Sequence, residues 1–556
     1  MKTQEERASK TVSLDKNLGG EGVTRRSFMG GAGAMMMGLA AMAAGVSTAH
    51  ADEAAEAEDA EAEAAEAEEA EATEEAAETA EEEAAATSNY PTIESVTGWT
   101  GTPEDVLALG VSTMPLADLN QYRKAYVDAQ TDYTCADGTV IPACYVKVRA
   151  LIHTYGYGAG NTVNDTTFDD IVKNFSEDDC QAFLDMPWGV EFTAYDMYIA
   201  TGRDVDECTE ICDRLSDAGY LRGYDSYQGR KYCQVSNVIG VAEYHLTEYY
   251  ETDNGTLSED AIAIWGADVN DDLANGGTPP LYYVPCDESA TSDGTILPVD
   301  DLKAKARSSS YACIVPCFCR YKALAEAYGH ENIPSFEDFA TGEYEDYFSD
   351  LCDQRVETCL MLGDEAKYWV EQGMGREISG EQAAEYIQRS ADDGFMLEST
   401  FSKNSEAICS CHADSCFLVQ GWLALGDAET IASSNSFKQI SHYTLEVDPD
   451  LCTACGLCVD RCPLHIISIN DEGWAEPDVD CFRCGQCAYV CPQGARKLVQ
   501  RDESELAEMP QSWLDENNVA AAYRFETGLI TFPESSDDAA TEETATEEAA
   551  TEELAE

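Results

Sequence analysis

The feature that most constrains this chain is a pair of matching cysteine runs near its C-terminal end. Each run has the spacing C-x2-C-x2-C-x3-C-P, and the two runs begin at Cys452 and Cys481. Three thiolates from one tight loop can ligate three corners of a cubane cluster, while the fourth thiolate has to arrive from elsewhere. Tetracysteine zinc sites also use C-x2-C pairs, but they do not need a third cysteine at the same spacing. The runs therefore favour two [4Fe–4S] clusters.

The two runs resemble the bacterial ferredoxin module with two [4Fe–4S] clusters, over residues 441–500. Gly456 and Gly485 inside the loops, and Pro463 and Pro492 after the fourth cysteines, agree with this resemblance. In this family the fourth cysteine of each run ligates the other cluster. The resemblance therefore implies two ligand sets, which are Cys452, Cys455, Cys458 and Cys491 for one cluster, and Cys481, Cys484, Cys487 and Cys462 for the other.

A second group of cysteines lies in residues 301–440, which we interpret as a helical region with expected helices over 359–372 and 381–390. Its members are Cys313, Cys317, Cys319, Cys352, Cys359, Cys409, Cys411 and Cys416. So many cysteines close to proline and glycine turns exceed what ordinary core packing uses. The order C-x-C-R, E-T-C-L, G-x-G-R-x-I and C-x-C, ahead of the two runs, is similar to that of a recurrent class of bacterial iron–sulfur proteins.

From this second group we predict one further metal centre, either [4Fe–4S] or zinc. The predicted ligands are Cys317, Cys319, Cys352 and Cys359, with Cys409 and Cys411 as substitutes. Structural disulfides and buried free thiols are the alternatives.

The first 51 residues indicate a targeting segment. Arg25 and Arg26 precede an uncharged stretch rich in Gly, Ala and Met, and an A-x-A cleavage pattern ends at Ala51. This segment resembles a twin-arginine export signal, a route that carries folded proteins with their cofactors installed. We expect the protein at the periplasmic or extracytoplasmic face of the cell membrane, without a stable transmembrane span after signal cleavage. An uncleaved signal that tethers the protein is the alternative.

The net charge of -74 comes from 107 acidic against 33 basic residues. Residues 52–88 and 534–556 are Glu/Ala/Thr repeats, which we interpret as a disordered spacer and a disordered tail. The remaining chain is also acidic, so phosphate backbones would be repelled and nucleic acid is not expected as a partner.

Residues 89–300 form the predicted N-terminal body, and residues 501–533 a C-terminal extension. Within the body, expected helices at 192–201 and 204–218 and a hairpin near 227–235 resemble a winged-helix unit at 176–245. The second helix is too acidic to read DNA, so we interpret the unit as a packing or docking element. Cys208 and Cys212 share its apolar face and are expected to be core thiols. Cys135 and Cys144 flank another expected hairpin, where a disulfide is conceivable.

Together these features predict an α+β protein. Mostly helical N-terminal and middle regions precede a ferredoxin-like module with two [4Fe–4S] clusters. The predicted function is exported iron–sulfur electron transfer between redox protein partners, and no catalytic residue is assigned. One alternative is an iron–sulfur reductase whose mid-chain centre is catalytic. A redox-sensing winged-helix regulator is disfavoured by the export signal and by the acidic second helix.

Overall fold

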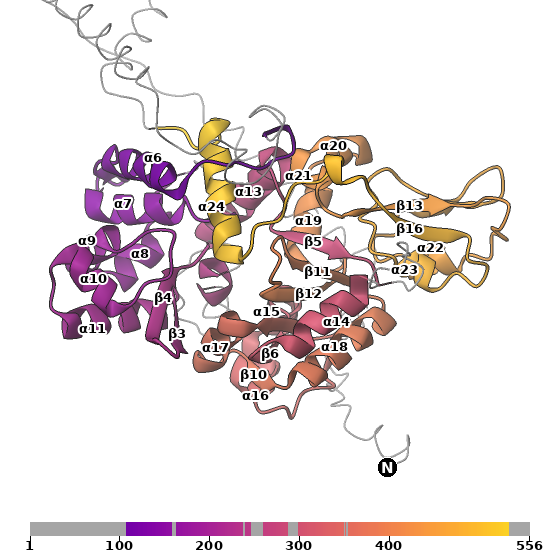
Figure 1. Cartoon of the computed structure of the whole chain (residues 1–556), viewed down its shortest axis with the longest axis horizontal. Coiled ribbons are helices and arrows are strands. Elements are labelled where there is room, and N and C mark those ends of the chain that lie inside the picture. Colours follow the sequence, from indigo (N-terminus) through magenta and orange to yellow (C-terminus); the bar gives the residue numbers. More distant parts are fainter. Residues whose placement is uncertain are drawn as a thin grey trace, which may run out of the picture.

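The computed structural model describes residues 107–532, except for 158–162, 237–239, 246–258, 287–297, 350 and 352–353. The predicted export signal, the two acidic flanks and Cys352 therefore lie outside the described residues. None of the described helices combines the length and the apolar character needed to cross a membrane. In Figure 1 the N-terminal body lies at the left, a sheet at the lower centre and the C-terminal module at the right.

The N-terminal body is a group of helices with two small hairpins. Its elements are α6 (Leu116–Asp128), β1 (Tyr133–Thr134), β2 (Val140–Ile141), α7 (Ala143–Ile152), α8 (Asp169–Asn174), α9 (Glu177–Asp185), α10 (Ala194–Thr201), α11 (Val205–Asp217), β3 (Leu221–Ser226) and β4 (Gly229–Gln234). Capping boxes start α9 at Ser176 and α10 at Thr193, where each cap hydroxyl accepts from the backbone N–H three residues later.

The predicted helices at 192–201 and 204–218 and the predicted hairpin are confirmed as α10, α11 and β3–β4. Cys208 and Cys212 are fully buried in the core of this body, as expected of core thiols. The hairpin between Cys135 and Cys144 is also present, but both cysteines are free thiols and no disulfide joins them. The likeness to a winged helix stays a prediction.

The middle of the chain is built around a six-stranded antiparallel sheet. Its order is β10-β6-β9-β12-β11-β5. The strands are β5 (Leu281–Val284), β6 (Ala312–Pro316), β9 (Glu357–Leu362), β10 (Arg376–Ile378), β11 (Met396–Thr400) and β12 (Ala407–Cys411). A small hairpin, β7 (Phe348–Ser349) and β8 (Gln354–Arg355), precedes β9.

Helices cover both faces of this sheet (Figure 1). One face packs on α14 (Pro298–Ser308) and α18 (Gly380–Asp393). The other face packs on several helices, namely α13 (Glu259–Asn275), α15 (Phe318–Tyr328), α16 (Phe336–Ala340), α17 (Gly363–Glu371), α19 (Phe417–Ala424) and α21 (Asn435–Lys438). A 3₁₀ turn at His330–Asn332 follows α15, and α20 (Ala428–Ser433) precedes α21.

The prediction of a mostly helical middle region missed the six-stranded sheet at its centre, although helices hold more residues there than strands do. The predicted helix over 359–372 is instead the strand β9 followed by α17, whereas the helix at 381–390 is confirmed within α18. All six residues of β9 are buried, because the strand lies inside a sheet covered on both faces. Such a strand has no polar alternation, so its apolar run merges with the helix that follows.

The C-terminal module is a duplicated unit of strands and short helices. Antiparallel pairs form between β13 (Tyr443–Val447) and β16 (Arg496–Gln500), and between β14 (Ile467–Ile469) and β15 (Ala475–Pro477). The helices α22 (Leu457–Arg461) and α23 (Gln486–Tyr489) each lie within one cysteine run. The structure is thus α+β, as predicted, with this module following the sheet.

After the module the chain returns to the N-terminal body. A 3₁₀ turn at Glu503–Glu505 leads to α24 (Trp513–Glu526), which lies between the body and the sheet in Figure 1. The buried Arg524 of α24 donates hydrogen bonds to the carbonyl oxygens of His153 and Gly156, and it pairs with Asp272 of α13 at 3.3 Å. This arginine therefore joins the first, middle and last parts of the described chain.

We expect Arg524→Ala to destabilise the protein by about 3–5 kcal/mol, because it removes a buried charge that pairs with a buried carboxylate. Arg307→Ala is the control, since Arg307 forms an exposed ion pair with Glu381. Thermal unfolding followed by circular dichroism measures both variants. Equal melting temperatures for the two variants would show that α24 does not anchor the fold.

Candidate metal centres

The C-terminal module contains two small cavities that are lined by its eight cysteines. One cavity is lined by Cys452, Cys455, Cys458 and Cys491. The other is lined by Cys481, Cys484, Cys487 and Cys462. Each cavity thus combines three cysteines of one run with the fourth cysteine of the other run. The structure brings together the two sets of four that the resemblance implies.

The loops around both cavities have the same backbone conformation. Ala454 and Arg483, each two residues after the first cysteine of its run, have φ values of 51° and 61°. Gly456 and Gly485 follow at 82° and 83°, so each loop carries two left-handed residues. Residues other than glycine avoid this region, so its repetition at Ala454 and Arg483 shows that both loops follow the same unusual backbone path.

Hydrogen-bond donors face the sulfur atoms of the module. The backbone N–H of Ala475 donates to the Cys452 Sγ at 3.4 Å. Backbone hydrogen bonds from Ala475 and Ala454 lower the pKa of Cys452. Donors of this kind stabilise negative charge on sulfur, which a thiolate ligand carries.

Arg496 lies between the two cysteine sets. Burial lowers the pKa of this guanidinium, but the neighbouring thiols of Cys487 and Cys458 outweigh burial, so its pKa is raised overall. Cys458 belongs to the first set and Cys487 to the second. The Arg496 Nη2 also donates to the Ala475 carbonyl oxygen at 2.6 Å, which fixes the side chain in place. A single buried cation therefore serves both sets of thiolates.

Six of the mid-chain cysteines contact one another on one face of the six-stranded sheet, and we call them the six-thiol ring. Cys317 contacts Cys319 and Cys359, Cys416 contacts Cys319 and Cys411, and Cys409 contacts Cys359 and Cys411. Each thiol therefore touches two others and the chain of contacts closes. Its members are Cys317, Cys319, Cys359, Cys409, Cys411 and Cys416.

The alternation of side chains in the sheet explains how the ring forms. Cys359 on β9 and Cys411 on β12 point to the same face as Met361 and Ala407, opposite to the face of Leu360. Cys409, two residues before Cys411, shares that face. The other three cysteines come from helix starts, because Cys317 precedes α15, Cys319 lies in its first turn and Cys416 precedes α19.

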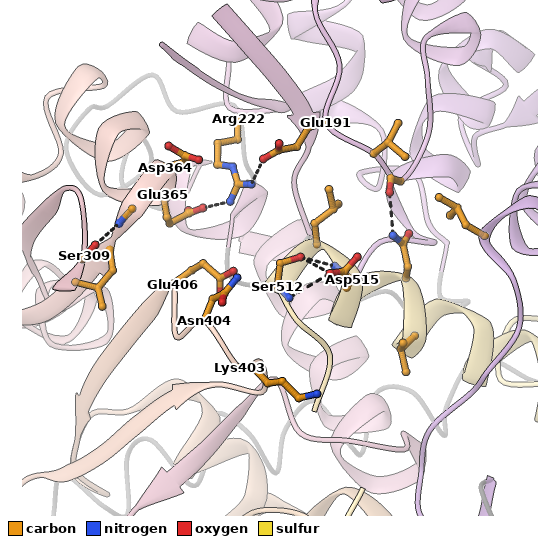
Figure 2. A pocket seen from close by; sticks show the side chains of 18 of the residues that line it. Glu191, Arg222, Ser309, Asp364, Glu365, Lys403, Asn404, Glu406, Ser512 and Asp515 are labelled. Atoms are coloured by element: carbon orange, nitrogen blue, oxygen red, sulfur yellow. Dashed lines mark hydrogen bonds and ion pairs between the residues drawn. The ribbon is translucent and has the colours of Figure 1, made fainter. Parts of the chain in front are cut away.

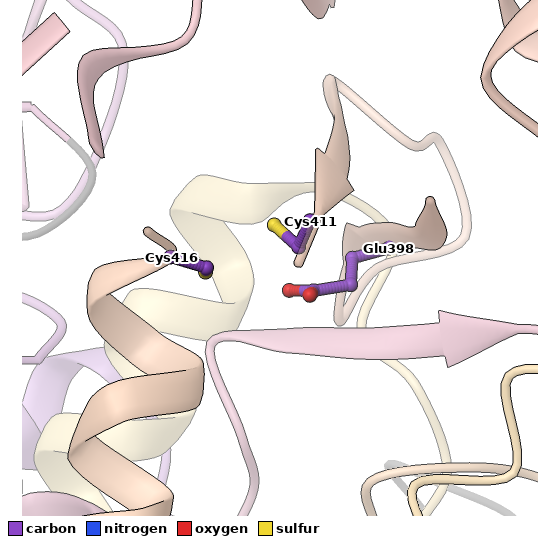
Figure 3. A group of neighbouring side chains, drawn as sticks. All are labelled: Glu398, Cys411 and Cys416. Atoms are coloured by element: carbon purple, nitrogen blue, oxygen red, sulfur yellow. The ribbon is translucent and has the colours of Figure 1, made fainter. Parts of the chain in front are cut away.

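A buried acid, Glu398 of β11, lies beside the six-thiol ring. It is the cross-strand partner of Cys409, and ligand atoms of Glu398, Cys411 and Cys416 lie within 4.8 Å of one another (Figure 3). Burial and the nearby thiols of Cys416 and Cys409 raise the pKa of Glu398 well above its usual range. Its Oε1 is buried and has no hydrogen-bond partner among the described residues.

The structure brings together five of the predicted mid-chain ligands, namely Cys317, Cys319, Cys359, Cys409 and Cys411. It adds Cys416 and Glu398, which the sequence analysis did not name as ligands. Cys313 lies on the same sheet face as Cys359 but contacts none of the ring thiols. Cys352 lies outside the described residues. All the cysteines that the structure describes are free thiols, so the disulfide alternative is absent from it.

A cavity of about 850 Å³ lies between the N-terminal body, the sheet and α24 (Figure 2). Arg222 of β3 spans its wall, and its Nη1 pairs with the Glu365 Oε2 of α17 at 2.5 Å. Behind this wall, burial raises the pKa of Glu243 to about 7, with further contributions from Cys409 and Glu365. Glu243 thus interacts electrostatically with both Cys409 of the six-thiol ring and Glu365 of the cavity wall.

Comparisons with known proteins agree with the geometry of the module. The family model of the 4Fe–4S binding domain matches residues 445–468. An uncharacterized ferredoxin of Methanocaldococcus jannaschii is 41% identical over 56 residues, which are 9% of this chain and 89% of that protein. The chain thus belongs, through its C-terminal module, to the ferredoxin-type iron–sulfur proteins, and this module is a 4Fe–4S cluster-binding domain.

Two further relatives match only in part. A probable ferredoxin of Methanosarcina thermophila is 58% identical over 33 residues, or 6% of this chain and 57% of that protein. The electron transfer subunit of thiosulfate reductase from Salmonella typhi is 30% identical over 95 residues, or 16% of this chain and 47% of that protein. The chain thus spans about half the length of these two relatives. No solved structure matches the chain.

We expect Arg496→Gln to lower the reduction potential of the module by roughly 40–90 mV, which corresponds to about 1–2 kcal/mol of lost charge stabilisation. Lys497→Gln is the control, because it removes the same charge from the exposed neighbouring residue of β16. A redox titration followed by paramagnetic resonance measures both. Equal shifts in the two variants would contradict a specific role for Arg496.

Proposed function

We propose that this protein is an exported electron carrier that holds two [4Fe–4S] clusters in its C-terminal module. The observation that carries the proposal is the pairing of the cysteines, since each cavity draws three from one run and one from the other. Bound in these sites, the clusters take up and release single electrons. The cysteines of each set hold one cluster, and Arg496 offsets the negative charge of both.

The two cysteine sets of the module differ in their exposure to solvent. In the first set Cys455 is exposed, Cys452 and Cys491 are half-buried and Cys458 is buried, whereas in the second set Cys481 is half-buried and the other three cysteines are buried. The first set therefore lies where a redox partner can approach, and the second set faces the body of the protein.

The surface beside the first set suits transient docking of a redox partner. Leu451 and Leu457 are about half exposed, at 47% and 48%. The neighbouring Asp450 and Asp460 are also exposed. Exposed apolar side chains with acidic neighbours fit a partner whose docking face is apolar with a basic rim. The likeness to an electron transfer subunit of a reductase supports a role as an intermediate carrier.

Export through the twin-arginine route is the second part of the proposal. It is supported by Arg25 and Arg26 ahead of the uncharged stretch and by the need to assemble iron–sulfur clusters in a reducing compartment.

An iron–sulfur reductase is the alternative function, and one observation favours it. The 850 Å³ cavity is lined by Leu362 at the end of β9 and by Glu406 just before β12, so a substrate in it would lie against the two strands that carry Cys359, Cys409 and Cys411. A small-molecule substrate that changes the spectrum of a mid-chain centre would favour the reductase over the carrier.

Replacing one cysteine in each set tests the cluster assignment. We expect Cys458→Ala and Cys487→Ala each to lose about four irons per chain and one of two paramagnetic signals, because each removes one ligand of one cluster. Cys208→Ala, a core thiol of α11, is the control and should keep all the iron. Zinc in place of iron, or loss of iron in the control alone, would contradict the assignment.

Replacing the paired arginines tests export. We expect Arg25→Lys with Arg26→Lys to retain the uncleaved protein in the cytoplasm of a host with the twin-arginine pathway. Arg7→Lys, in the same segment, should be exported normally. Cell fractionation measures the location of both variants, and equal export of the two would contradict this part of the proposal.

A further inference from the structure

The six-thiol ring differs from an ordinary buried group of cysteines. Its members come from two strands and two helix starts, and they are separated by as many as 99 residues in the chain. Cys208 and Cys212 show the ordinary case, in which neighbouring thiols one helical turn apart fill an apolar core. In the ring each thiol contacts two others, and an acid with an unpartnered oxygen lies against them. A buried oxygen of this kind is costly unless something else binds it.

We propose that the six-thiol ring and Glu398 bind a third iron–sulfur centre, placed to exchange single electrons with the second cysteine set of the module.

The surroundings of the ring favour thiolates over thiols. α15 begins directly after Cys317 and α19 directly after Cys416, so the positive ends of two helix dipoles face the sulfurs. The backbone N–H of Phe417 donates to the Cys319 Sγ at 3.2 Å. These donors stabilise negative charge at three of the six sulfurs, as metal ligation requires.

A buried cation, Arg320, lies next to the strands that carry the six-thiol ring. Arg320 is 1% exposed and donates to the Thr358 Oγ1 at 2.7 Å and to the Ser410 carbonyl oxygen. Thr358 precedes Cys359, and Ser410 lies between Cys409 and Cys411. The guanidinium is thus fixed between the two strands that supply half of the ring, and its charge offsets that of a thiolate-rich centre.

The number and type of donors favour iron–sulfur chemistry over a single zinc ion. Structural zinc sites are tetrahedral and closed by four ligands, whereas the ring offers six sulfurs and a carboxyl oxygen. Soft thiolates also suit iron–sulfur clusters. A polynuclear centre uses more of the donors present than one tetrahedral ion can.

Two packed aromatic side chains connect the six-thiol ring to the second cysteine set of the module. Tyr283 of β5 is the cross-strand partner of Glu398 of β11, so it lies beside the acid of the proposed centre. The centroid of the Tyr283 aromatic ring lies 5.0 Å from that of the Phe482 aromatic ring, and Phe482 lies between Cys481 and Cys484 in the sequence.

The contact between the sheet and the module is held rigidly. The Cys286 N–H donates to the Cys484 carbonyl oxygen at 3.1 Å. The buried Gln486 donates to the carbonyl oxygens of Ala391 and Phe395 at 3.0 and 2.7 Å. Tyr283 and Phe482 are fully buried, so this boundary is dry. Transfer of one electron across it oxidises one centre and reduces the other, and it breaks no bond and moves no proton.

The test uses the full chain, purified without oxygen, and measures iron, sulfide, zinc and paramagnetic resonance. The variant Cys409→Ala with Cys411→Ala should lose all iron beyond about eight atoms per chain and keep the two signals of the module. Cys313→Ala is the matched control, because Cys313 is a buried thiol on the same sheet face outside the ring. It should keep the iron of the unaltered chain. The iron of the module also reports that the double variant has folded.

Glu398→Gln is a second variant that preserves side-chain size. It should change the resonance of the third centre and leave the signals of the module unchanged. In the reduced protein, the signal of the second cysteine set should be broadened by a neighbouring spin, and the broadening should vanish in Cys409→Ala with Cys411→Ala.

Three outcomes would overturn the inference. They are equal iron in the ring variant and the unaltered chain, zinc as the metal lost with the ring, or disulfides among the ring cysteines. The placement of the centre rests on the proposed function, but its existence does not. In Cys458→Ala with Cys487→Ala the third signal should persist, so loss of the module clusters and loss of the ring centre are separate results.

Discussion

The structure depends on one requirement, which is that a thiolate from each cysteine run reaches into the loop of the other run. Cys491 lines the cavity of the first run and Cys462 the cavity of the second, so neither cavity is complete until both runs have folded together. The antiparallel pairing of β13 with β16 brings the two ends of the module into register. Arg496, on β16, then lies between the sets and faces a cysteine of each. The gathering of the cysteines, the strand pairing and the charge compensation by Arg496 are thus parts of one arrangement.

The module is continuous with the rest of the protein. One hydrophobic core contains sulfurs of the six-thiol ring, Tyr283, Phe482 and sulfurs of the module. The exposed first cysteine set lies at the far side of this arrangement, and the ring lies at its inner end. Buried apolar side chains of this core therefore separate the sulfur groups from one another. The 850 Å³ cavity is lined by Glu365 and by Leu362 at the end of β9.

The parts of the structure that follow from local spacing could be predicted, and those that follow from strand register could not. The helices α10, α11 and α18 are encoded by residues close together in the chain, whereas the exchange of the fourth cysteine between the two runs was implied by the resemblance to ferredoxins. The strand β9 was mistaken for a helix because it is buried on both faces and shows no alternation. Glu398 could not be recognised as a candidate ligand from sequence, because an acid within an apolar stretch is placed beside the thiols only once β11 pairs with β12 and Glu398 lies opposite Cys409.

The most direct test of the central arrangement is an anomalous diffraction map at the iron absorption edge, from crystals grown without oxygen. The account predicts one group of iron peaks bounded by Cys452, Cys455, Cys458 and Cys491, and a second bounded by Cys481, Cys484, Cys487 and Cys462. Cysteines of a single run closing on one metal ion, or sulfurs of the two runs joined to each other without iron, would contradict it.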